Sequence, residues 1–374
     1  MTAVHRWCLV ALGVLALVVA PVAVSAWPAA DSDESATSLA ARVRASGEVA
    51  YSGYVESVGG LGLPTTDEFS EVADLFGTTN RLRVWWRSSE DWRVDRLATA
   101  GETDLFHADG ATTTWDFERL AVGRTADQLV FLPRTVDLLP SQLGRRVLAQ
   151  ARPGELTRLP AERVAGHDAL GLRLTPSAGQ ASIDHVDIWV HDDSGLPVRV
   201  EIWGAGDSAP ALATAFDELT VAEPAAEVTT FRTPAGVTVG SSGVDDDSLV
   251  GHIPTVFWSG SLAGLPRVLE DRLAPVGRYG RGVTQLVVLA LDDEVADPLR
   301  DQLGSTAGAV VDRAGTALSA GPLHLLLSPC RGNAPSWLLV GTVDEQTLRR
   351  AARTVYGNGA RWSVAAGPGS GSGP

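Results

Sequence analysis

The stretch from Asn80 to Leu120 limits the fold of this chain more than any other feature. Short runs rich in β-branched and aromatic residues alternate there with compact turns, and tryptophans stand on the runs at strand spacing. One turn is the pair Asp109 and Gly110, a strong hairpin signal. This pattern predicts an antiparallel meander rather than a helix. A meander with large apolar residues on one face must pack that face against other elements or hold a ligand on it.

The composition excludes several classes of function. Of the 374 residues, 45% are hydrophobic, which is enough for a substantial core and for more than one domain. The formal net charge of −15 argues against a nucleic-acid partner, because nucleic-acid binding needs a basic surface. All 30 basic residues are arginine, so Schiff-base lysines and the lysine of a phosphate-binding loop are excluded.

Residues 1–26 are predicted to be a secretory signal peptide. An apolar run from Cys8 to Val24 is followed by a small-residue cleavage pattern that ends at Ala26. The run is also long enough for an uncleaved N-terminal membrane anchor, and this alternative stays open. In both cases we expect an extracytoplasmic protein, secreted or attached to the outer face of the cytoplasmic membrane. After cleavage Cys330 is the one remaining thiol, so no intramolecular disulfide is expected.

Changes in composition divide the rest of the chain into five parts. We expect a linker and short helix at 27–47, a first domain at 48–235, a linker at 236–255, a small α+β domain at 256–357 and a disordered Gly/Ser tail at 358–374. The second linker contains the acidic run Asp245 to Asp247.

Several elements can be placed within these parts. Helical spacing of apolar residues predicts helices at 35–46, 69–76, 138–150 and 294–303. Strict alternation predicts a hairpin from 182–190 to 198–203, with Val186, Ile188 and Val190 on one face. A capping box from Thr342 to Glu345 predicts the start of a helix that runs through Val355.

Few residues form a catalytic or metal-binding pattern. Alternation puts His185, Asp187 and His191 on one strand face, where they could ligate a metal, but they are spread along the strand and a solvated face is favoured. His107 and Asp109 flank a turn and could be an acid–base pair, although the turn alone explains Asp109. No cofactor or metal is expected, and a secreted hydrolase that uses His185, Asp187 or His107 remains an alternative of another class.

The aromatic residues of the meander are the stronger functional signal. Alternation along the runs is predicted to put them on one shared face, and two reasons for that face stay open. The residues fill a core, or they line a cavity for an apolar chain, whose transfer from water is worth about 0.8 kcal/mol per CH₂ group. The predicted lining is Leu82, Val84, Trp86, Trp92, Val94, Trp115, Phe117, Val186 and Ile188.

Four segments resemble the LolA/RseB group of proteins. They are Tyr51-Ser-Gly-Tyr-Val, Ala108-Asp-Gly-Ala-Thr-Thr-Thr-Trp-Asp-Phe, Val164-Ala-Gly-His-Asp-Ala-Leu-Gly-Leu-Arg-Leu-Thr-Pro and Ile188-Trp-Val-His-Asp-Asp-Ser-Gly-Leu-Pro-Val-Arg-Val-Glu. The resemblance covers about residues 48–235 and implies a curved antiparallel half-barrel closed by helices. The two-domain layout is similar to the RseB type. Arg87 resembles the arginine of that group's second hairpin, with Ser88 where the group has proline, and we place it at the polar mouth of the cavity.

The resemblance implies a function outside the cytoplasm. We expect a non-enzymatic protein that binds a lipid or an acylated protein in the half-barrel and an anti-sigma-factor membrane protein as partner, in envelope-stress signalling. A lipid or lipoprotein carrier of the LolA type is the second hypothesis.

Overall fold

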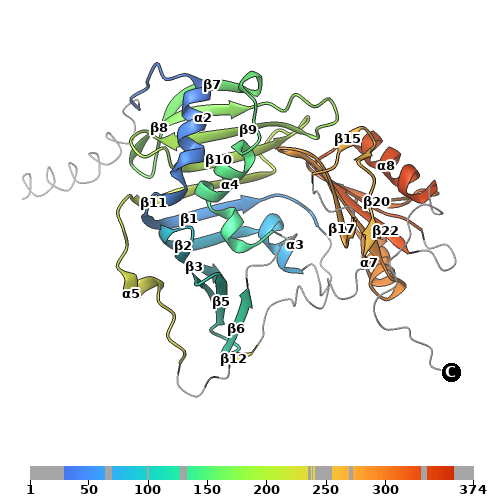
Figure 1. Ribbon diagram of the computed structural model, residues 1–374, viewed down its shortest axis with the longest axis horizontal. Coiled ribbons are helices and arrows are strands. Elements are labelled where there is room, and N and C mark those ends of the chain that lie inside the picture. The colour runs from blue at the N-terminus through green and yellow to red at the C-terminus, as the bar shows by residue number, and fades with distance from the viewer. Residues whose placement is uncertain are drawn as a thin grey trace, which may run out of the picture.

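The computed structural model describes residues 29–63, 70–98, 101–126, 133–234, 237, 239–240, 255–268, 273–329 and 335–357. The predicted signal peptide, Cys330, the run Asp245–Asp247 and the tail at 358–374 lie outside the described residues. The described strands form one large and one smaller sheet and two short two-stranded sheets (Figure 1). Within the described ranges no helix combines the length and apolar character needed to span a membrane.

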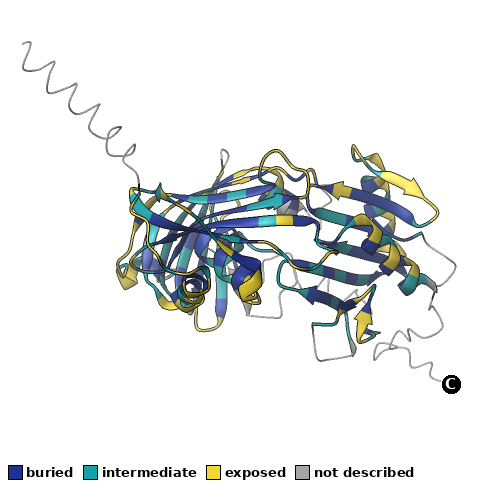
Figure 2. Cartoon of the chain, turned by 90° about the horizontal axis from the view of Figure 1, so that it is seen from above, coloured by how far each residue is buried: buried dark blue, intermediate teal, exposed yellow. Residues whose placement is uncertain are grey.

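The large sheet has twelve strands in the order β12-β6-β5-β4-β3-β2-β1-β11-β10-β9-β8-β7. Neighbours are antiparallel except β12 and β6. The two end strands do not pair, so the sheet curves without closing (Figures 1 and 2). The strands are β1 Tyr51–Gly59, β2 Thr79–Ser88, β3 Asp91–Ala98, β4 Gly101–Ala108, β5 Ala111–Asp116, β6 Ala121–Ala126, β7 Leu156–Val164, β8 His167–Leu174, β9 Ile183–His191, β10 Pro197–Gly204, β11 Leu212–Thr220 and β12 Val239–Gly240.

The meander and the late hairpin predicted from the sequence are both present. Strands β2 to β6 pair consecutively, and the β4–β5 turn places Asp109 at φ 52 and Gly110 at φ 67, as a tight hairpin turn requires. Strands β9 and β10 pair through Ile188 and Val200. The predicted fold class, a curved antiparallel half-barrel closed by helices with a small α+β region, is confirmed.

Short helices cover the concave face of the large sheet (Figure 1). They are α2 Ala36–Ala45, the 3-10 turn η1 Ser46–Glu48, α3 Ser70–Gly77, the 3-10 turn η2 Thr135–Leu138 and α4 Pro140–Leu148. Helix α2 starts at Ser35, whose hydroxyl accepts a hydrogen bond from the Ser38 amide at 3.2 Å. Pro140 stands in the first turn of α4, where the missing N–H costs nothing. Each helix presents one apolar stripe to the sheet.

The smaller sheet has the order β17-β18-β22-β21-β20-β19 and a helix on each face. Leu348 and Val355 of α8 pack on one face, and Leu299 and Leu303 of α7 on the other. Elements outside the large sheet are η3 Pro153–Glu155, α5 Ala226–Thr229, β13 Val256–Phe257, β14 Ser261–Leu262, β15 Leu265–Pro266, β16 Leu273–Ala274, β17 Val276–Arg281, β18 Thr284–Leu291, α7 Asp293–Ser305, β19 Val310–Asp312, β20 Gly315–Ala320, β21 Leu323–Leu327, β22 Ser336–Gly341 and α8 Glu345–Gly357.

The predicted capping box of α8 is wrong by two residues. The carboxylate of Asp344 accepts the Thr347 amide at 2.6 Å and is the cap. The Thr342 hydroxyl instead donates to the carbonyl of Val283 at 2.5 Å, because this residue continues the contact between β22 and β18.

Charged and apolar contacts join the two sheets. Arg281, at the end of β17, forms an ion pair with Glu155, which is 5% exposed. Burial opposes the charge of Glu155, but hydrogen bonds from Arg281 and Ser177 outweigh it and lower its pKa to about 2. Leu61, Ala211 and Ala320 form a small apolar cluster that also spans the junction. The smaller sheet is therefore docked on the half-barrel through complementary groups.

Candidate ligand-binding face

Seven of the nine predicted lining residues share the concave face. In β2 and β3, Trp86 pairs with Trp92 and Val84 with Val94, so these four side chains point to one side. They belong to one buried apolar cluster with Leu82. Val186 and Ile188 of β9 lie under α2 and α4 in the adjacent cluster, which also contains Leu39 and Leu148.

The other two predicted residues do not lie on this face. Trp115 pairs with Asp104, whereas Trp92 pairs with His107, three residues further along β4. Residues an odd number apart on a strand point to opposite faces, so Trp115 lies on the outer, convex face. Phe117 is 60% exposed in the turn after β5. Alternation could not be carried from one strand to the next, because each turn resets which residues face one another.

A row of stacked rings crosses four adjacent strands on the concave face. Tyr51 stacks on Trp86 with centroids 6.1 Å apart and planes at 7°. Trp86 stacks on Trp92 at 5.7 Å and 3°, and Trp92 on His107 at 5.0 Å and 9°. All four residues are at most 4% exposed. The row forms a flat, largely apolar floor of the kind on which an apolar chain can lie.

Helices and turns cover this floor through apolar packing, with Val136, Leu138 and Leu139 buried in the same cluster, and through a few hydrogen bonds. The Tyr51 hydroxyl and the Ser141 hydroxyl of α4 are 2.6 Å apart, and the Thr214 hydroxyl donates to the Leu138 carbonyl at 2.6 Å. The Trp86 indole N–H reaches the Gly47 carbonyl at 3.4 Å. We call the segments α2, η1, η2 and α4 the helical cover. The concave face is thus filled by the helical cover in this structure, and an apolar ligand would have to take its place.

Beyond the aromatic row, towards β5, the same face becomes more polar. Thr103, Leu105, Thr112 and Thr114 point to the concave side there and are half-buried. Helices α2 and α4 lie over the other end of the sheet, around β8 to β11 (Figure 1). The β4–β5 end is therefore the accessible end of the face, with hydroxyl groups around one leucine.

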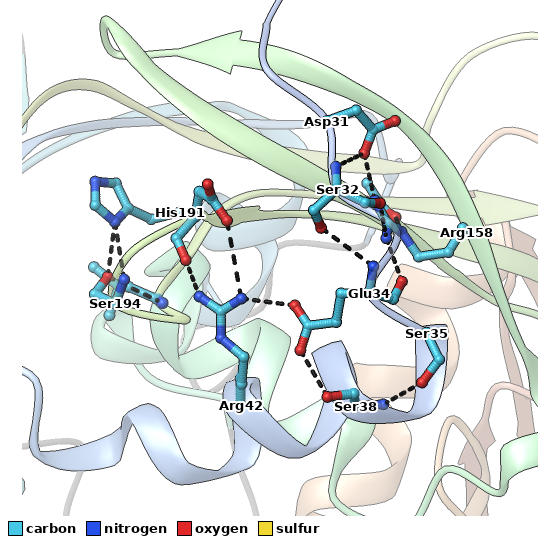
Figure 3. Close-up of polar contacts among 12 residues, drawn as sticks. Asp31, Ser32, Glu34, Ser35, Ser38, Arg42, Arg158, His191 and Ser194 are labelled. Atoms are coloured by element: carbon cyan, nitrogen blue, oxygen red, sulfur yellow. Dashed lines mark hydrogen bonds and ion pairs between the residues drawn. The ribbon is translucent and has the colours of Figure 1, made fainter.

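The N-terminus of the helical cover is held by arginines (Figure 3). Arg158 donates to Asp31 at 2.6 Å and to the Ser32 carbonyl at 3.0 Å, and Arg42 pairs with Glu34 at 2.7 Å. Arg158 of β7, together with the hydrogen bond from Arg42 of α2 to the Asp192 carbonyl after β9, fastens the start of α2 to the half-barrel. A single partly exposed ion pair contributes little to stability, but several pairs together hold one segment in place.

Arg87 has a different place from the predicted cavity mouth. Its guanidinium binds Asp91 at 2.7 Å, Glu223 at 2.7 Å and the Pro224 carbonyl at 2.5 Å. It therefore anchors residues 223–234, which contain α5 and which we call the strap. The strap crosses the outer face, since it packs with Phe106 and Trp115 around a shared pocket.

Of the candidate catalytic residues, His185 and Asp187 approach each other, with Nε2 and Oδ2 3.7 Å apart, but both are engaged by other groups. Arg173 holds Asp187 through two hydrogen bonds of 2.6 Å, and His185 stacks on Trp203 at 5.5 Å. His191 bonds His167 at 3.2 Å instead. The remaining candidate, His107, meets the Thr112 hydroxyl at 3.1 Å within the aromatic row. Among the described residues these groups form no cluster of metal ligands, and the His191 imidazole also meets the Ser194 hydroxyl at 3.0 Å.

The structure adds a charged cluster on the outer face that the sequence reading missed. Carboxylate oxygens of Asp95, Glu102 and Asp104 lie within 4.8 Å of one another. Arg93 binds Asp95 at 2.6 Å and Asp104 at 2.9 Å, and Arg83 binds Asp95 at 2.9 Å. Burial and the neighbouring Asp95 charge raise the pKa of Asp104 to about 7. Alternating arginines and aspartates in β2 and β3 were the available signal, but only the strand register shows that they meet.

Comparison with solved structures gives the following likenesses. The MucA/MucB complex of Pseudomonas aeruginosa matches with 18% identity and a TM-score of 0.49, over 85% of this chain and 96% of that one. A structure of MucB alone matches with 15% identity and a TM-score of 0.48, over 86% and 98%. A LolA superfamily protein from Nitrosomonas europaea matches with 12% identity and a TM-score of 0.24, over 53% and 98%.

MucB and a LolA superfamily protein are thus among the solved structures to which the chain is similar, and the sequence resembles the same group. At these identities no residue role is carried over. No protein-family model and no curated protein matches the sequence.

Proposed function

We propose that this protein is an exported, non-enzymatic binding protein of the RseB type. Its concave face takes the acyl chain of a lipid or an acylated protein, and it contacts an anti-sigma-type membrane protein in envelope-stress signalling. The observation that supports this proposal most directly is the floor of stacked rings covered by short helices. A second sheet would close such a face permanently, whereas short helices that pack on it through a few apolar side chains and hydrogen bonds can leave it.

The position of the ligand follows from the same geometry. A chain that enters at the β4–β5 end passes Leu105 and reaches the ring of Trp92, and it replaces contacts that the helical cover makes with the floor. Each buried CH₂ group contributes about 0.8 kcal/mol, so a long acyl chain can offset the displacement of α4. The hydroxyls around the entry suit the polar part of the ligand.

The proposed protein partner is based on the sequence resemblance to the RseB type. The structures of MucB with MucA describe that pair of proteins, and for this chain an anti-sigma-type partner remains to be tested. The signal-peptide pattern supports a place outside the cytoplasm. Among the described residues, the separation of His185, His191 and His107 favours binding over hydrolysis.

Two neighbouring threonines of β5 provide a matched test. Thr114 points to the concave face and pairs with Leu105, while Thr113 points outward and pairs with Phe106. We expect Thr114→Trp to narrow the entry and to weaken binding of a myristoylated peptide about tenfold or more, a loss of about 1.4 kcal/mol. Thr113→Trp, with the same substitution on the other face, should bind like the parent protein.

Native mass spectrometry of the chain purified without detergent gives the readout. A bound acyl chain that Thr114→Trp reduces and Thr113→Trp does not would support the proposal. An absence of uptake by the parent protein, or an equal effect of both variants, would reject the concave face as the site. Transfer of the bound lipid to an acceptor membrane, without binding to any anti-sigma-type fragment, would favour the carrier hypothesis instead.

A further inference from the structure

The outer face of the half-barrel carries a second pocket, distinct from the concave face. It has a volume of about 330 Å³ and lies between strands β3 to β5 and the strap. Arg93, Asp104, Phe106 and Trp115 line it from the sheet, and Glu227, Phe231 and Arg232 from the strap. Phe231 packs on Phe106 with ring centroids 5.1 Å apart. The volume lies in the range of small-molecule sites, about 300–1,000 Å³.

The charges at this pocket do not balance. Three carboxylates, those of Asp95, Glu102 and Asp104, face the two guanidinium groups of Arg83 and Arg93, and the strap adds one charge of each sign, Glu227 and Arg232. One negative charge is left over in a place where Asp95 is fully buried. A buried charge without a counter-charge is costly, so the cluster favours one additional positive charge.

Asp104 is where that additional charge fits. The residue is 7% exposed and lines the pocket. Its Oδ2 binds Arg93 at 2.9 Å, but its Oδ1 has no hydrogen-bond partner among the described residues. A buried carboxylate oxygen without a donor loses the free energy of its hydration, so a donor that enters the pocket would restore it.

The surroundings select an organic cation over a metal ion. The two guanidinium groups already occupy oxygens of all three carboxylates, and a divalent ion would bring them close to a like charge. The remaining walls include Trp115 and Phe231, whose ring faces attract ammonium groups but give a metal no ligand. The ring of Phe106 already carries the Arg93 guanidinium, 4.7 Å from its centroid. We propose that this pocket binds a small organic ammonium ion with an aromatic or branched apolar body, its N–H donating to Asp104.

Phenethylamine is the probe, and phenethyl alcohol is its neutral counterpart of similar shape. Isothermal titration of the purified chain at about pH 8, where Asp104 is ionised, should show saturable binding of one amine. The alcohol should bind about tenfold more weakly or worse, because it brings no charge to Oδ1. Between about pH 8 and pH 5.5 the affinity for the amine should fall while Asp104 takes up a proton.

Asp104→Asn should weaken amine binding about tenfold or more, whereas Asp116→Asn on the next strand should not. Because Asp104 is buried, a surface variant gives an independent check. Val228→Trp fills the pocket from the strap and should abolish binding, while Val221→Trp, outside the pocket, should not change it. The proposal is overturned if the amine does not bind at millimolar concentration, if the alcohol binds equally well, or if the folded Asp104→Asn and Val228→Trp variants keep the parent affinity.

Discussion

Tyr51→Phe tests whether the helical cover competes with the ligand. The Tyr51 and Ser141 hydroxyls are 2.6 Å apart and both residues are 1% exposed, so the substitution removes one hydroxyl and leaves the other buried without that partner. A lost hydrogen bond of this kind lowers the free energy of unfolding by about 1–2 kcal/mol. The ring row is retained, because the phenyl ring still stacks on Trp86.

The same loss has a defined effect on binding. If an acyl chain binds only after α4 leaves the floor, weakening the covered state by about 1 kcal/mol tightens the apparent affinity about fivefold. Stability is measured by urea denaturation followed through tryptophan fluorescence, and affinity by titration with myristate. The double variant Tyr51→Phe with Ser141→Ala should recover part of the lost stability, since no lone hydroxyl remains.

Tyr279→Phe is the matched control. Tyr279 lies in the smaller sheet, is fully buried and donates to the Ser259 carbonyl at 3.3 Å. Its loss should lower stability without changing the affinity for myristate. The reasoning is refuted if Tyr51→Phe binds myristate more weakly than the parent protein, or if both tyrosine variants change the affinity alike.

Three further predictions concern other contacts. Glu155→Gln should lower the free energy of unfolding by about 2–3 kcal/mol, less than a fully buried pair because Arg281 is 28% exposed, while the exposed Glu162→Gln should cost under about 1 kcal/mol. The folded pKa of Glu155 is lowered, so its contribution is present above about pH 4.5 and is lost as the pH falls towards 2, which urea melts against pH will measure. Arg158→Ala should speed amide exchange in residues 31–45, and Arg163→Ala, whose ion pair stays within the β7–β8 hairpin, should not. Trp92→Ala should lower the free energy of unfolding by about 3–5 kcal/mol, measured by thermal or chemical unfolding. An equal loss for Trp85→Ala, whose side chain is half-buried on the other face, would contradict a special contribution of the stacked rings.

Local elements of this fold are well predicted by local chemistry. The hydroxyl of Ser35 and the ring of Pro140 set the starts of α2 and α4, and the pair Asp109 and Gly110 forms the tight turn between β4 and β5. Alternation within one strand is equally dependable, since Val186 and Ile188 share their face as predicted. These features depend on neighbours in sequence.

Alternation does not predict which face of the sheet a side chain takes in the strand after a turn. Trp92 and Trp115 look equivalent in the sequence, but the register of β4 places them on opposite faces. Arg87 contacts Glu223 and Pro224 of the strap, which come 136 and 137 positions later in the sequence. No local feature of the sequence predicts this contact. The cover on the concave face and the pocket on the outer face both arise from such long-range placement, so they needed the structure.

Photo-crosslinking with a diazirine-bearing fatty acid tests the central claim most directly. The proposed site predicts that mass spectrometry finds the label on concave residues around Leu105, Trp92 and Trp86, and that excess myristate removes it. Label confined to outer-face residues such as Trp85 and Trp115, or label that myristate does not displace, would contradict the account.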